Sequence, residues 1–81
     1  MADYAVHPGE VLAEKLAELG MSQREFATRT GLTPKHINRI IRGHAGYRAA
    51  TAIRFERVTG MSATLWLQLQ ANYQTAKARQ Q

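Results

Sequence analysis

The stretch MSQREFATRTGLTPKHINRIIRG, residues 21–43, decides which fold we predict. Ser22 followed by Glu25 is a capping box, in which the hydroxyl and the carboxylate each satisfy a free backbone N–H at the start of a helix. Gly31 can adopt the left-handed backbone conformation that ends a helix, and Pro34 suits the first turn of the next one. The stretch therefore predicts two short helices joined by a tight turn.

Four residues at demanding spacing indicate how these two helices pack. Ala27 is small enough to let the helices approach, and Gly31 follows four residues later in the turn. Ile37 and Ile40 can then pin the second helix across the first. This combination is typical of a helix-turn-helix, which we place at residues 23–42. A helical hairpin without a nucleic-acid role is the alternative.

The predicted packing leaves a polar outer face on the second helix. Arg39 can grip O6 and N7 of guanine with two hydrogen bonds, so we assign it to base readout. Gln23 and Arg24 begin the first helix, where they can hold a phosphate beside its free N–H groups. Asn38 can contact a base or phosphate, or hydrogen-bond the following loop. The residues predicted to contact double-stranded operator DNA are Gln23, Arg24, Thr33, Pro34, Lys35, His36, Asn38, Arg39 and Arg42.

Basic and aromatic side chains continue beyond this helix. We expect Arg42, His44, Tyr47 and Arg48 to contact backbone phosphates where the chain leaves the second helix. Arg54 and Arg57 can extend the electrostatic footprint, although solvation is the simpler expectation for both.

Helix starts and stops recur on both sides of this motif, and no segment alternates apolar and polar residues as a strand would. A first helix is predicted over residues 8–19, and a fourth, without a good N-terminal cap, over about 49–59. Ser62 caps a C-terminal helix of about 63–79. We therefore predict an all-α, five-helix fold with a single helix-turn-helix domain over residues 1–81.

Charge is distributed unevenly along the chain, whose net charge is +5. Residues 1–22 carry one basic and four acidic side chains, whereas residues 23–57 carry eight basic and two acidic ones. A basic middle beside an acidic first helix favours a molecule with one face for phosphates. A merely solvated basic surface is the alternative.

Composition excludes several classes of protein. There is no cysteine, and therefore neither a disulfide framework nor a thiolate metal site; we predict no metal and no cofactor. No apolar run approaches the roughly 20 residues that span a bilayer, and no secretory leader is recognisable. A cytoplasmic location without membrane association is the expectation.

The C-terminal helix spreads apolar residues over more than one stripe, so it needs burial on two sides. One side can face the domain core, and the other can meet a second copy, which compensates for a small core. The homodimer interface is predicted to contain Leu65, Trp66, Leu69 and Tyr73. Trp66 is expected to give about half of its surface to the core.

The chain resembles the HigA-type antitoxins of the Xre, or Cro/C1-like, helix-turn-helix family. The resemblance is carried by HPGEVLAEKL at residues 7–16, residues 21–43, TAIRFERVTG at residues 51–60 and LWLQLQANY at residues 65–73. It covers most of the chain. It implies a five-helix fold, dimerisation through the C-terminal helix, repression of the chain's own operon and neutralisation of a HigB-like ribonuclease toxin.

Functions of other classes find less support in the sequence. The three histidines and the carboxylates have no metal-ligand spacing, and Ser22 and Ser62 are explained as helix caps. A ribonuclease could use His36 beside Lys35 and Arg39, but an exposed helix offers little pocket. The chain is therefore not expected to be an enzyme. A protein-binding module without operator function and the N-terminal module of a longer Xre-family regulator remain alternatives.

Overall fold

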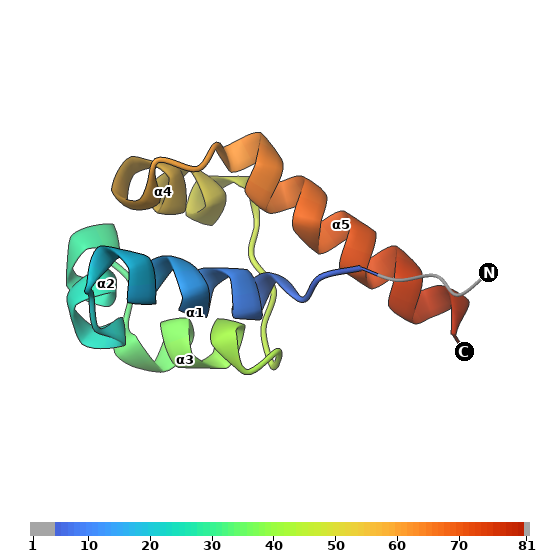
Figure 1. Cartoon of the computed structure of the whole chain (residues 1–81), viewed down its shortest axis with the longest axis horizontal. Helices are drawn as coiled ribbons and strands as arrows, with labels where there is room; N and C mark the ends of the chain where they lie inside the picture. Colours follow the sequence, from blue (N-terminus) through green and yellow to red (C-terminus); the bar gives the residue numbers. More distant parts are fainter. Residues whose placement is uncertain (1–4, 81) are drawn as a thin grey trace.

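The computed structural model describes residues 5–80, which form five α-helices and no strand (Figure 1). The helices are α1 (Pro8–Leu19), α2 (Gln23–Thr30), α3 (Pro34–Ile41), α4 (Ala49–Thr59) and α5 (Ala63–Arg79). The prediction of an all-α, five-helix fold is confirmed, and the observed helices agree with the predicted ranges to within about a residue.

Polar side chains begin three of the helices as predicted. The hydroxyls of Ser22, Thr33 and Ser62 each accept the backbone N–H three residues later, at 3.0–3.1 Å. The N-terminus of α4 has no side-chain cap, as expected. The capping box at Ser22 is only half formed, however, because the Glu25 carboxylate accepts from the Arg29 guanidinium at 2.7 Å instead.

Each helix packs mainly against two others, and these contacts close a ring around the core. Helix α1 packs against α3 and α5, while α2 packs against α3 and α4. Helix α4 is joined to α5 by a short turn and packs against it. In Figure 1, α3 lies along the lower edge and the last turns of α5 extend beyond the other helices.

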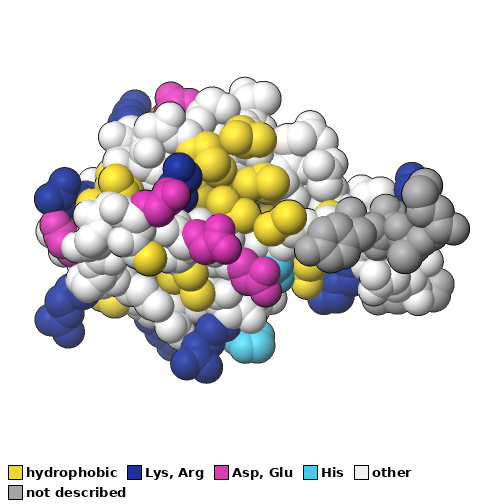
Figure 2. Space-filling model, in the orientation of Figure 1, with side chains coloured by type: hydrophobic (Ala, Val, Ile, Leu, Met, Phe, Trp, Pro, Cys, Tyr) yellow, Lys and Arg dark blue, Asp and Glu magenta, His cyan; other side chains and the backbone are white. Residues whose placement is uncertain are grey.

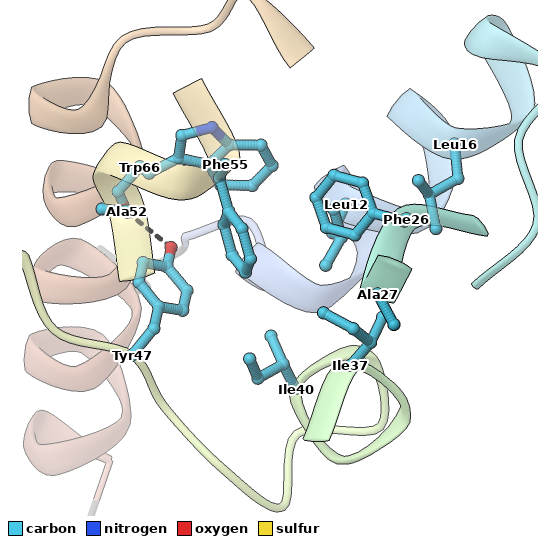
Figure 3. Close-up of a cluster of buried hydrophobic side chains, with 10 residues drawn as sticks. All are labelled: Leu12, Leu16, Phe26, Ala27, Ile37, Ile40, Tyr47, Ala52, Phe55 and Trp66. Carbon is cyan, nitrogen blue, oxygen red and sulfur yellow. Dashed lines mark hydrogen bonds between the residues drawn. The ribbon is translucent and has the colours of Figure 1, made fainter. Parts of the chain in front are cut away.

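An aromatic cluster joins α2, α4 and α5 (Figure 3). The Phe55 ring lies 5.4 Å from Phe26, 5.4 Å from Tyr47 and 5.3 Å from Trp66, measured between ring centroids. Such separations suit tilted and edge-to-face aromatic contacts. The buried hydrophobic residues of the cluster are Leu12, Leu16, Phe26, Ala27, Ile37, Ile40, Tyr47, Ala52, Phe55 and Trp66.

Trp66 lies wholly inside this core, with no exposed surface. Its indole N–H points to the Thr59 hydroxyl at 3.4 Å, so the polar edge also faces the protein. The prediction that Trp66 contributes half of its surface to a dimer interface is therefore wrong. The spacing within α5 does not reveal this burial, because the Phe55 ring that packs against the indole comes from α4.

Within residues 5–80, every helix is too short or too polar to cross a membrane.

Candidate nucleic-acid interface

The turn between α2 and α3 has the packing that the sequence predicted. Ala27, Ile37 and Ile40 are all buried, and Gly31 ends α2 in the left-handed conformation at φ 79°. Because a small residue stands at the crossing point, α3 lies close across α2 with its polar side chains outward. This is the geometry of a helix-turn-helix.

The start of α1 fixes the far end of α3. A Cβ atom at Gly9 would overlap the backbone carbonyl oxygens of Ile40 and Ile41, so only glycine allows this approach. His7 precedes it and accepts the Gly9 N–H on Nδ1 at 2.9 Å. The His7 ring also meets the Tyr73 ring edge-on at 4.7 Å. Residues 7–9 therefore tie α1, α3 and α5 together.

Sequence reasoning missed this role of His7 and Gly9. Histidine is an unusual N-cap, whereas Pro8 at the first helical position is an ordinary sign of a helix start. A glycine next to that proline, inside a helix that prefers alanine, was the available sign of a close backbone approach.

The outer face of α3 is exposed and basic. Lys35, Arg39 and Arg42 are exposed, and Figure 2 shows Lys and Arg side chains projecting from the lower edge, where α3 lies. Thr33 and Pro34 form its N-terminus, and His36 is half-buried. Gln23 and Arg24 open α2, so all nine residues predicted to contact DNA come from α2, α3 and their ends.

The Asn38 side chain hydrogen-bonds α2 and not the loop that follows α3, while its contact with a base or phosphate stays a prediction. Its side-chain amide donates to Gln23 Oε1 at 3.1 Å and so joins α3 to the start of α2. A glutamine amide has two N–H donors in addition to this oxygen, and these remain available to a phosphate. The two residues therefore form a unit in which Asn38 positions Gln23.

Arg39 is tied to the loop that follows α3. Its Nη2 donates to the His44 carbonyl oxygen at 3.1 Å, and the His44 N–H donates to the Arg39 carbonyl oxygen at 2.8 Å. A guanidinium carries five N–H donors, so four remain for a base or phosphate. The loop restrains the Arg39 side chain without consuming its hydrogen-bonding capacity.

Tyr47 lies in the core, and the prediction that it contacts a phosphate is wrong. Its hydroxyl donates to the Trp66 carbonyl oxygen at 2.5 Å, and burial raises its pKa to about 12. The phenol is therefore protonated at neutral pH and remains a donor. The Gln70 amide accepts the Tyr47 N–H at 2.8 Å and donates to the Tyr47 carbonyl oxygen at 2.6 Å, which fixes the loop to α5.

The sequence suggested that Arg54 is only solvated, but its side chain forms a hydrogen bond within the protein. Its Nη1 donates to the Thr30 carbonyl oxygen at 2.6 Å, at the C-terminus of α2. A side chain at Gly31 would meet that same nitrogen, so the glycine also makes room for the guanidinium. Arg54 thus holds α4 to the helix-turn-helix.

Comparison with known proteins agrees with this geometry. The family model HTH_3, described as helix-turn-helix, matches residues 12–66. The chain is 39% identical over 77 residues to virulence-associated protein I of Dichelobacter nodosus, covering 94% of this chain and 71% of that protein.

Two solved structures share the whole arrangement. The antitoxin HigA of Pseudomonas aeruginosa, solved with the higBA promoter, superposes with a TM-score of 0.85 at 36% identity, covering 93% of this chain and 83% of that one. An addiction module antidote protein of the HigA family from Coxiella burnetii gives a TM-score of 0.86 at 33% identity, covering 96% and 84%.

Proposed function

Because the chain belongs to the HTH_3 family of helix-turn-helix proteins, we propose that it is a sequence-specific repressor that binds the operator of its own operon. The observation that carries the proposal is the exposed basic face of α3, held on a rigid frame by Ala27, Ile37 and Ile40. A helix of this width fits the major groove, where base pairs present distinct hydrogen-bonding patterns. The likeness to a HigA antitoxin solved with promoter DNA supports it.

Within this proposal, Arg39 reads a base and the remaining residues position the protein. Lys35 and Arg42 lie on the same exposed face, and the start of α2 offers Gln23, Arg24 and free N–H groups to a phosphate. Removing a base-reading arginine costs about 1–3 kcal/mol of discrimination, or roughly a fivefold to 150-fold loss of preference.

The first experiment is a fluorescence-anisotropy titration against the DNA just upstream of the gene and against a scrambled duplex, at several salt concentrations. We expect tight, steeply salt-dependent preference for the upstream DNA. Arg39→Ala should lose most of that preference while still binding both duplexes. Equal, weak binding of the wild-type protein to both duplexes would refute the operator proposal.

Arg24→Ala is the matched control. It removes a charge at a position proposed for phosphate contact, so it should weaken binding to both duplexes by a similar factor and leave the preference intact. Circular dichroism should show that both variants are folded, because both side chains are exposed. If Arg39→Ala also leaves the preference unchanged, Arg39 does not read a base.

We further propose that two copies pair through α5, placing their recognition helices about 34 Å apart, in successive major grooves. Leu65 is 45% exposed, and Leu69 and Tyr73 are half-buried, so they retain surface for such an interface. Leu65→Lys should therefore give a folded monomer by light scattering in high salt, whereas Thr64→Lys, at an exposed polar site, should remain dimeric there. A dimeric Leu65→Lys protein would exclude Leu65 from the contact.

The finer proposal is that the protein neutralises a HigB-like ribonuclease toxin. It is supported by the likeness to HigA antitoxins. Co-expression with a small ribonuclease encoded beside the gene should restore growth that the ribonuclease alone arrests, and the two proteins should co-purify. Continued growth arrest, with no complex formed, would leave operator binding as the function and remove the antitoxin role.

A further inference from the structure

A basic hollow lies between the C-terminal end of α2 and α4, with a volume of about 290 Å³. It is lined by Thr28, Arg29, Thr30, Gly31, Arg54 and Arg57. None of these residues belongs to α3, so the basic hollow is separate from the proposed DNA-reading face. It contains three guanidinium groups and no acidic side chain, which makes it suited to an anion.

The arginines of the basic hollow keep donors available. Arg54 uses one nitrogen on the Thr30 carbonyl oxygen, at 2.6 Å, and this bond restrains its guanidinium. Arg29 is paired with Glu25 at 2.7 Å. The Arg57 side chain is exposed and forms no hydrogen bond or ion pair with residues 5–80. Because each guanidinium has five N–H donors, Arg54 and Arg57 can together hold two carboxylates.

The opposite charge is gathered on α1. We call Glu10, Glu14 and Glu18 the acidic stripe: they are exposed, recur every four residues and so lie on one helix face. Figure 2 shows acidic side chains in a row over α1. Glu18 pairs with Lys15 at 3.3 Å, whereas Glu10 and Glu14 form no ion pair with the described residues. Like charges at this spacing destabilise a helix unless a cation neutralises them.

The two surfaces match in spacing. Side chains three or four residues apart on a helix have Cβ atoms about 5–6 Å apart. Arg54 and Arg57 on α4 are three apart, and Glu10 and Glu14 on α1 are four apart, so two carboxylates can face two guanidinium groups. The exposed Ala13, beside Glu14, leaves room for close approach.

We propose that the acidic stripe of one copy docks into the basic hollow of a second copy. The two surfaces differ, so the contact is head-to-tail and separate from any pairing through α5. The outer face of α3 contributes to neither surface. Copies on neighbouring DNA sites would consequently stabilise one another, although the contact itself requires no DNA.

Sedimentation velocity of the purified protein without DNA tests this contact. At about 0.1 M salt the Debye length is about 10 Å, and at about 1 M it is about 3 Å, so charge pairing between copies is favoured only in the first buffer. We expect the weight-average mass to rise with protein concentration at low salt. At high salt, the part of this increase that comes from charge pairing should disappear. Pairing through apolar side chains of α5 would persist in both buffers.

Charge reversal identifies the surfaces involved. Arg57→Glu and Glu14→Arg should each abolish the salt-sensitive association, and the variant carrying both changes should recover it, because the charges again match between copies. Lys77→Glu, an equal reversal at an exposed site outside the basic hollow, should associate like the wild type.

The proposal is overturned if the wild type shows no salt-sensitive association, if Arg57→Glu behaves like Lys77→Glu, or if the double variant fails to recover. Circular dichroism is the control that each variant is folded. Because the measurement uses no DNA, failure here leaves the operator proposal standing, and failure of operator binding leaves this one standing.

Discussion

Trp66→Ala should destabilise the monomer fold by about 3–5 kcal/mol, the range for deleting a fully buried large aromatic side chain. The indole has no exposed surface and contacts the Phe55 and Tyr47 rings, so its loss leaves a cavity in the middle of the aromatic cluster. Small domains have total stabilities of about 5 kcal/mol at the lower end. Urea denaturation should therefore find the variant largely unfolded or close to it.

Leu65→Ala is the matched control for that experiment. Leu65 neighbours Trp66 on α5 but is 45% exposed, so truncating it should cost much less stability in the monomer. The comparison separates a core role from an interface role. Similar losses for the two variants, both dependent on protein concentration, would contradict the assignment of Trp66 to the core.

Gly9→Ala is expected to destabilise the protein by at least about 1–3 kcal/mol, the range for overpacking a core. Helix propensity alone predicts the opposite sign, since alanine is favoured over glycine within a helix by about 1 kcal/mol. The added methyl group would overlap the carbonyl oxygens of Ile40 and Ile41, which are backbone atoms that cannot rotate away. Comparing the denaturation midpoints of the variant and the wild type shows whether Gly9→Ala lowers or raises the free energy of unfolding.

Gly20→Ala provides the comparison. A Cβ there meets nothing within 4 Å, but the residue has φ 63°, so the cost is one of backbone conformation alone, about 1 kcal/mol. Gly9→Ala should be the more damaging change and should also weaken DNA binding, because it displaces the end of α3. A Gly9→Ala protein as stable as wild type would show that α1 does not approach α3 so closely.

Much of the fold follows from local chemistry that a sequence displays. Ser22, Thr33 and Ser62 cap helices because a hydroxyl can reach the N–H three residues ahead, which involves no other part of the chain. Gly20, Gly31 and Gly60 end helices for an equally local reason. Within the helix-turn-helix, the spacing of Ala27, Ile37 and Ile40 places the polar face of α3 outward.

The errors arose where a residue's surroundings come from distant parts of the chain. Tyr47 lies in the segment between Arg42 and Arg48, and these basic residues suggested a phosphate contact. Its hydroxyl instead reaches the Trp66 carbonyl oxygen, 19 residues away. Arg54 was likewise expected to be solvated. Its acceptor, the Thr30 carbonyl oxygen, is 24 residues away in sequence and lies near Arg54 only because α2 packs against α4.

The sequence by itself determined the five helices, their ends and the basic outer face of α3, because helix signals and helical periodicity act over a few residues. Only the tertiary structure decided that Trp66 is core, that Gly9 must lack a side chain and that Asn38 holds Gln23. It also placed Arg54 and Arg57 in one hollow with Arg29. Burial, close approach and long-range hydrogen bonds depend on which elements meet, and packing of the whole chain settles that.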